Sequence, residues 1–231
     1  MKRIAVWVSV LFIAALGQPA LARDCHFVEG EARWKIKTSV PAGALRRKVK
    51  PTDLRALMGL KNPKLTAAQK KAIASKPRTQ GVTVGDDSLQ EGEIVSVEGF
   101  LYRARCQKDG DYHLEIGTSS TTGKSCLIVE VPDPGQVRDR ALRDLVKQVR
   151  QKLDGFPSGI FNGKSAPLPV KVTGQFFLDS QHLRRDNPKT GKKADPSGGR
   201  GTKFNGKNCA TNVWEIHPVT DLVRLSSRVR S

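Results

Sequence analysis

The sequence has few aromatic residues and no long apolar run beyond its first sixteen residues. Phe, Trp and Tyr make up 6% of the 231 residues, whereas charged residues make up 27%. This composition predicts a modest hydrophobic core. No later stretch approaches the ~20 apolar residues that a membrane-spanning helix needs, so we expect no transmembrane segment.

Short motifs of several enzyme classes are also absent. There is no C-x-x-C pair, which argues against zinc ribbons and thioredoxin-type sites, and no H-E-x-x-H or G-x-S-x-G. Two Gly-Lys-Ser tripeptides resemble the end of a phosphate-binding P-loop. The preceding glycine is one residue too distant in 117–125 and one too close in 159–165. Because that loop needs a fixed spacing to aim its backbone N–H groups, neither segment is expected to bind nucleotide phosphates.

The first 22 residues have the three regions of a cleavable secretory signal peptide. Lys2 and Arg3 are positive, residues 4–16 are apolar, and residues 20–22 are Ala-Leu-Ala. This order predicts cleavage after Ala22 and a periplasmic or extracellular protein. The alternative is a buried N-terminal strand or helix.

Residues 23–90 form a basic, loop-rich segment with weak structural signals. Alternation over 33–38 predicts a short strand. Residues 51–60 have the pattern of a short helix capped by Thr52, and a second helix is expected from Thr66 to the residue before Pro77. This segment is not expected to fold alone.

Residues 91–231 have clearer periodicity. Glycines at 99 and 174 interrupt two long strand patterns and predict sharp bends. Strands are expected at 92–106, 112–116, 126–131, 168–178 and 212–219, and a helix at 139–153. This order predicts a mainly β (α+β) fold, a five-stranded OB-fold-like Greek-key barrel with one helix between strands three and four. An SH3-like barrel and an open α+β sheet are the alternatives.

Four cysteines in an exported chain suggest two disulfides, with three possible pairings. Cys106 closes the first expected strand and Cys209 precedes the fifth, so we expect both at the pole of the barrel that carries its binding loops. The prediction is therefore Cys106–Cys209, with Cys25–Cys126 joining the N-terminal segment to the barrel.

Positive charge is concentrated outside the barrel strands. Residues 31–80 contain fourteen Lys and Arg but two acidic residues, and the insert at 180–208 contains eight against two. Between them, residues 81–179 are nearly neutral, with twelve basic and fourteen acidic residues. Clustered charge of one sign attracts polyanions, although it is also typical of a solvated, disordered loop. The insert is thus either a cationic binding arm or such a loop.

Three histidines of the barrel each have a carboxylate close in sequence. His113 lies between Asp111 and Glu115, and the other pairs are Asp179 with His182 and Glu215 with His217. The candidate metal ligands are His113, His182, His217, Asp179 and Glu215. Such a group could hold a divalent metal ion or supply a general base. The simpler interpretation is that each histidine hydrogen-bonds its neighbouring carboxylate and holds a loop in place.

Several sequence blocks resemble those of a group of uncharacterised exported bacterial proteins. The blocks are EARWKIKT at 31–38, DYHLEI at 111–116, IVEVPDP at 128–134, VKVTGQFFLD at 170–179 followed by His182, and WEIHPV at 214–219. The resemblance covers most of the chain after the signal peptide but carries no known activity. The Lys-rich insert after His182 departs from the pattern.

Together these features favour binding over catalysis. We expect an exported OB-fold module that binds a polyanion, nucleic acid or acidic polysaccharide, at its loop pole and needs no cofactor. The alternatives are a metal-dependent hydrolase or nuclease that uses the three histidines, and a structural envelope protein without a ligand. The expected binding residues are Arg184, Arg185, Lys189, Lys192, Lys193, Arg200, Lys203, Lys207, Tyr112 and Trp214, with Tyr102, Phe177 and Phe204 as further aromatic candidates.

Overall fold

A computed structural model describes residue 25 and residues 34–75, 81–84, 87–121, 124–183 and 194–226. The expected signal peptide lies outside the described residues, as do the expected binding residues Arg184, Arg185, Lys189, Lys192 and Lys193. Among the described helices, none has the length and apolar character that crossing a membrane requires.

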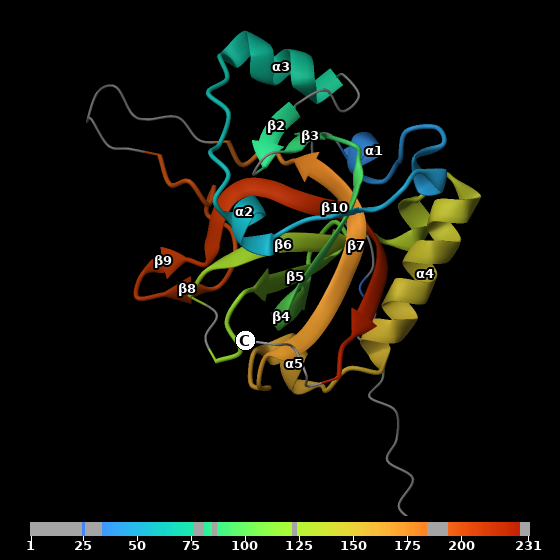
Figure 1. Cartoon of the computed structure of the whole chain (residues 1–231), viewed down its shortest axis with the longest axis vertical. Helices are drawn as coiled ribbons and strands as arrows, with labels where there is room; N and C mark the ends of the chain where they lie inside the picture. The colour runs from blue at the N-terminus through green and yellow to red at the C-terminus, as the bar shows by residue number, and fades with distance from the viewer. Residues whose placement is uncertain are drawn as a thin grey trace, which may run out of the picture.

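Five strands close into a β-barrel at the centre of the molecule (Figure 1). They are β4 (Ile94–Cys106), β5 (Tyr112–Gly117), β6 (Cys126–Val131), β7 (Leu168–Leu178) and β10 (Ala210–Arg224). Their order is β4-β5-β6-β10-β7, and β7 pairs back onto β4. β6 and β10 run parallel, whereas the other neighbours in the barrel are antiparallel. The mainly β class is therefore confirmed, and the barrel is consistent with an OB-like fold.

Shorter elements surround the barrel. β1 (Lys50–Pro51) pairs with β4, and two small ribbons are formed by β2 (Gly81–Val84) with β3 (Asp87–Gln90) and by β8 (Lys203–Phe204) with β9 (Lys207–Asn208). The helices are α1 (Trp34–Lys37), α2 (Leu54–Met58), α3 (Ala67–Ser75), α4 (Arg140–Asp154) and α5 (Gly159–Asn162), with 3-10 turns at Ala44–Arg46 and Pro134–Gln136.

Helix α4 begins at Arg140, one residue after the start of the helix expected at 139–153. The side chain of Asp139 accepts a hydrogen bond from the backbone N–H of Leu142 and so caps the helix. Leu142, Val146 and Val149 recur at helical spacing and are buried. Figure 1 shows the helix lying along one side of the barrel, so this apolar stripe closes the core on that side.

Two predictions about the N-terminal segment are wrong. Residues 34–37 form a helical turn rather than a strand, and Asp53, not Thr52, caps α2 by accepting a hydrogen bond from the Arg55 N–H. Alternating Trp, Lys, Ile and Lys mimic strand periodicity, but in the structure Lys37 is buried by tertiary contacts that override this local pattern.

The predicted disulfide pairing is also wrong, because the bonds are Cys25–Cys106 and Cys126–Cys209. Cys106 is level with the end of β6, since it pairs with Tyr112, which pairs with Val131. Cys209 adjoins the start of β6, where the Cys126 N–H donates to its carbonyl. The two ends of this six-residue strand are about 16 Å apart. A disulfide requires Cα atoms within about 7 Å, so Cys106 and Cys209 cannot join.

The two expected bend glycines lie where backbones approach each other closely. A Cβ atom at position 99 would lie 2.8 Å from the carbonyl oxygen of Gly117. One at position 174 would lie 2.6 Å from the carbonyl oxygen of Pro218 and 2.9 Å from the Cα of Val219. Glycine is therefore required for the tight crossings that let β4 and β7 coil around the barrel.

We predict that Gly174→Ala lowers the free energy of unfolding by about 1–3 kcal/mol, because its Cβ meets backbone that cannot move aside easily. Gly155→Ala is the matched control, since the nearest atom to its Cβ would be 3.5 Å away and its φ is −79°. Urea denaturation of both variants measures the difference. Equal stabilities would contradict the close-approach explanation.

Candidate functional site

A pocket of about 300 Å³ opens at one end of the barrel. It is lined by Lys37, Arg105, Gln107, Lys108, Asp109, His113, Glu130, His182, Gly199, Arg200 and Gly201. The loop that follows β4 and the chain that follows β7 therefore meet there. Of the three histidines considered from the sequence, His113 and His182 line the pocket and His217 does not.

Glu130 is the centre of the charged residues beneath this pocket. One carboxylate oxygen lies 3.0 Å from His113 Nδ1, and the other lies 2.8 Å from His217 Nδ1 and 3.1 Å from Lys37 Nζ. The strand order explains this convergence, because β6 lies between β5, which carries His113, and β10, which carries His217. Burial alone would raise the pKa of Glu130, but Lys37 and the two histidine hydrogen bonds outweigh it and hold that pKa well below its usual range.

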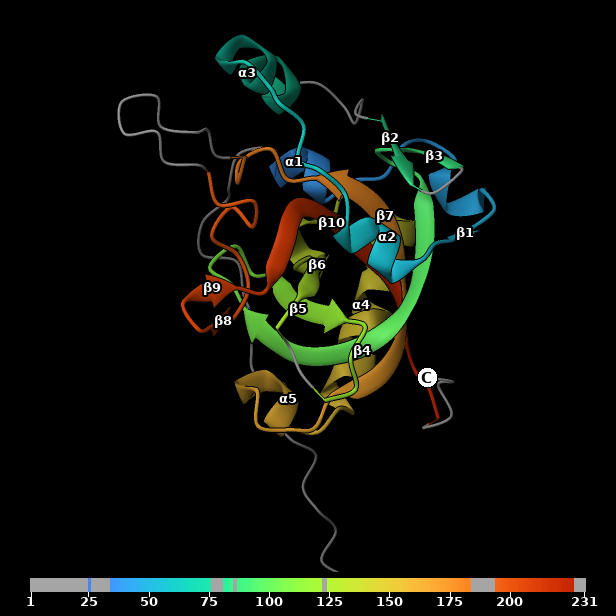
Figure 2. The same cartoon turned by 60° about the vertical axis from the view of Figure 1, so that its left-hand side comes forward.

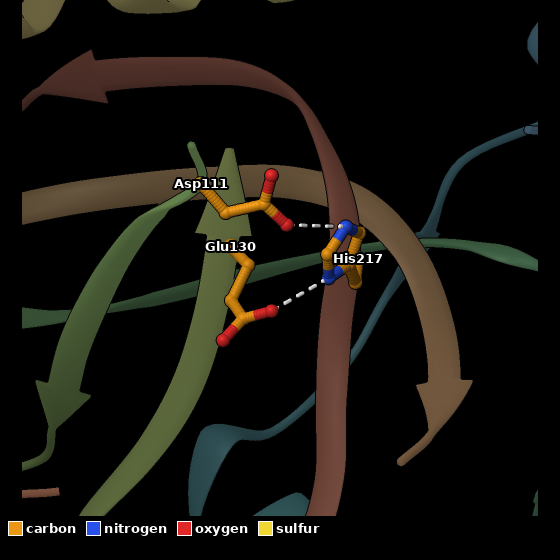
Figure 3. Close-up of side chains that lie close together, drawn as sticks. All are labelled: Asp111, Glu130 and His217. Atoms are coloured by element: carbon orange, nitrogen blue, oxygen red, sulfur yellow. Dashed lines mark hydrogen bonds and ion pairs between the residues drawn. The ribbon is translucent and has the colours of Figure 1, made fainter. Parts of the chain in front are cut away.

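His217 is fully buried and is surrounded by carboxylates (Figure 3). Besides Glu130, its Nδ1 lies 3.3 Å from Glu215, and its Nε2 lies 3.4 Å from Asp111. Burial would lower the pKa of His217, but hydrogen bonds to Glu130 and Glu215 overcome this effect and raise it to about 9. Burial raises the pKa of Asp111 to about 7, against the opposing charges of His217 and Lys37. His217 is therefore an imidazolium at neutral pH.

Arg200 forms a second buried cluster at the floor of the pocket. Its guanidinium donates to Glu215 at 2.6 Å, to Asp179 at 3.1 Å and to the Asn212 carbonyl at 3.1 Å. Asp179 also lies 2.5 Å from His182 Nδ1. Burial alone would lower the pKa of His182, but the hydrogen bond to Asp179 outweighs burial and raises that pKa. Arg200 is only 5% exposed and pairs with two buried carboxylates. It is therefore not the surface cation that the sequence of the insert suggests.

Among the residues that the structure describes, one group of side chains could hold a metal ion, and it is not the predicted group. Ligand atoms of Asp111, Glu130 and His217 lie within 4.8 Å of one another. The expected His113 and His182 are not part of it, nor are Asp179 and Glu215. A divalent ion would have to displace the proton that the surrounding carboxylates hold on His217, and Lys37 already occupies one Glu130 oxygen.

The two clusters pair buried carboxylates with buried cations. The four central carboxylates face four cations that burial does not neutralise, since the pKa of each cation is raised above its ordinary value. The carboxylates are Asp111, Glu130, Asp179 and Glu215, and the cations are Lys37, His182, Arg200 and His217. Buried charges of this kind persist when each is paired, so the arrangement favours an ion-pair network over a metal centre.

Three nitrogens at the pocket lack hydrogen-bond partners among the described residues. They are Arg105 Nε, His113 Nε2 and Arg200 Nε, all buried and all on residues that line the pocket. Nδ1 of His113 faces the Glu130 carboxylate, so Nε2 is the ring nitrogen left for a ligand. Buried donors without partners are costly, so the pocket is suited to a ligand that brings acceptor atoms.

Most of the expected aromatic ligand contacts belong to the core instead. The Trp214 ring stacks on Phe176 at 4.7 Å between centroids, and Tyr112 lies beneath the guanidinium of Arg150. Alternation along β5 and β10 turns these rings inward. Tyr102 and Phe177 are buried as well. Phe204, on the β8–β9 hairpin with the exposed Lys203 and Lys207, is the expected aromatic that remains exposed.

We predict that the protein loses stability from pH 7 to pH 9. The folded pKa of His217 is about 9 against 6.5 for the ordinary group. The folded state therefore holds the proton more tightly, and its stabilisation is complete below pH 6.5 and lost as pH rises through 9. The loss over this window is about 2 kcal/mol for this one group.

Urea denaturation at each pH measures this slope, and His217→Gln should flatten it. The imidazole resonance of His217 in the wild type gives the same information without a variant. A His217 that titrates near pH 6.5 would contradict the carboxylate cage described above.

Comparisons with known proteins add little to this site. No protein-family model matches the chain, and no curated protein does. Among solved structures, the chain is similar to the Entamoeba histolytica asparaginyl-tRNA synthetase, with 13% sequence identity and a TM-score of 0.30. That alignment covers 60% of this chain and 22% of the synthetase, and a likeness so weak carries no argument about function.

Proposed function

We propose that this protein is an exported OB-fold module that binds a polyanion by admitting one anionic group into the pocket between Lys108 and Arg200. The observation that carries the proposal is the set of buried nitrogens on Arg105, His113 and Arg200 that lack acceptors at the pocket. Phosphate, sulfate and carboxylate groups supply such acceptors and carry the matching charge.

The charge of the pocket supports an anion rather than a cation. Its lining contains four Lys or Arg side chains and two histidines against Asp109 and Glu130. Glu130 is already engaged by Lys37 and two imidazoles, and Asp109 lies 4.0 Å from Lys37. The negative charge of Glu130 is therefore engaged within the protein, and Lys108 is an exposed cation in the lining of the pocket.

The strand topology supports the OB assignment. If the five barrel strands are numbered along the chain, their order around the barrel is 1-2-3-5-4, and strand four pairs with strand one to close it. Strands three and five are parallel. Helix α4 lies between strands three and four in the chain. OB barrels use the loops at one end to bind oligonucleotides and oligosaccharides, and here two such loops form the pocket.

Two observations, the disulfides and the N-terminal sequence, support export. Two disulfides fit an oxidising compartment outside the cytoplasm, and the first 22 residues have the order of a signal peptide. The resemblance to exported bacterial proteins rests on its sequence blocks and agrees with this location.

We predict that binding of a heparin fragment or a short oligonucleotide weakens steeply with salt. Each neutralised phosphate of a single strand contributes a slope of about −0.7 in log affinity against log salt, because bound counterions are released. Lys108→Gln should lower the magnitude of this slope by about one contact. Fluorescence anisotropy over a series of salt concentrations measures it.

Lys147→Gln is the matched control. This lysine is also exposed, but it lies on α4, which Figure 1 shows on the side of the barrel away from the β8–β9 hairpin. Equal slopes for the two variants would move the binding surface away from the pocket, and binding without salt dependence would sink the proposal. Turnover of the oligonucleotide that a chelator abolishes would instead support the metal-dependent hydrolase.

A further inference from the structure

A short hairpin projects from the barrel beside the start of β10 (Figure 2). Lys203 pairs with Asn208 and Phe204 pairs with Lys207, so two residues form the turn. Asn205 and Gly206 have φ values of 49° and 77°. Two consecutive positive φ values are the signature of a type I′ turn, for which Asn-Gly is the favoured sequence. The hairpin is therefore a specified structure and not a loose part of the insert.

The hairpin is also firmly attached at its base. Cys209, the next residue, is bonded to Cys126 at the start of β6, and its N–H donates to the Thr202 carbonyl at 2.8 Å. The Asn208 side chain donates to Asp195 at 3.0 Å and to Ser197 at 3.2 Å. These bonds hold the hairpin in place, so a ligand that contacts it incurs little entropic cost of ordering it.

Phe204 presents its ring on this hairpin. It is 36% exposed, whereas the large apolar side chains of the described chain are otherwise covered except for Val49 and Val223. Lys207, its cross-strand partner, and Lys203, which precedes it in β8, are exposed as well. Because side chains alternate along a strand, Lys207 shares the face of Phe204 and Lys203 lies on the other face. Phe204 is the fourth residue after Arg200 of the pocket, so their Cα atoms are no more than about 14 Å apart even in a fully extended chain.

We propose that the β8–β9 hairpin is a base-stacking site that makes single-stranded nucleic acid the polyanion of this protein. A base stacks on Phe204 while Lys207, its cross-strand partner, contacts the phosphate beside it, and a neighbouring phosphate enters the pocket at Arg200. An exposed ring beside a cation is the combination that binds single strands without reading their sequence. An acidic polysaccharide offers the charge but no base. The inference rests on the proposed function and narrows it to one class of ligand.

The test compares three probes of equal length: an oligo-dT, an abasic deoxyribose-phosphate oligomer and a heparin fragment. Phe204→Ala should weaken binding of oligo-dT by between about five-fold and about 100-fold, the loss expected for one stacked base. It should leave the affinities for the abasic oligomer and the heparin fragment unchanged. Phe204→Tyr should retain the wild-type affinity for oligo-dT, because its ring stacks equally well.

Val223→Ala is the matched control, an exposed apolar residue near the end of β10 that is 40% exposed. It should leave all three affinities unchanged. Unaltered oligo-dT binding by Phe204→Ala would overturn the inference and leave polyanion binding intact. An equal loss for heparin would also overturn it, in favour of stacking on sugar rings. Failure of the wild-type protein to bind any probe would instead overturn the proposed function itself.

Discussion

Glu130 is the constraint on which the rest of the site depends. A buried carboxylate near the end of a barrel strand is costly unless positive charge and hydrogen bonds compensate it. Here β5 supplies His113, β10 supplies His217, and α1 supplies Lys37. The N-terminal segment is thereby joined to the barrel by an ion pair in addition to the disulfide from Cys25.

The same requirement shapes the pocket above this residue. Because the carboxylates bind cations of the protein itself, the remaining nitrogens at the pocket lack acceptors among the described residues. Arg200 illustrates this division, since one side of its guanidinium is bonded to Asp179 and Glu215 while its Nε has no partner among the described residues. This division is the basis of our proposal that the pocket admits an anionic group.

The sequence predicts the barrel well because period-two alternation survives in the strands. The expected bounds of the strands at 126–131 and 168–178 agree with those of β6 and β7. Two glycines marked the crossings correctly. The helical turn at 34–37 was missed because four residues are too few to distinguish helical from strand periodicity. The disulfide pairing was missed because it depends on the register between neighbouring strands, which decides which strand ends lie side by side.

The site was harder to predict because its residues meet only across strands. His182 with Asp179 is local and was visible in the sequence. Glu130 was overlooked, although a lone carboxylate within the apolar run Ile128 to Val131 was a signal that it must find buried partners. Lys37 and Arg200 gave no comparable signal, since each lies among other basic residues that look like solvated surface.

The most direct test of this account is an NMR titration of the imidazole resonances with inorganic phosphate, in metal-free buffer of low ionic strength. The account predicts saturable shifts at His113 and His182, which line the pocket, and a nearly constant signal from His217, which is buried beneath it. An absence of saturable shifts at His113, or shifts at His217 that require added zinc or manganese, would contradict an anion pocket above a self-neutralised network.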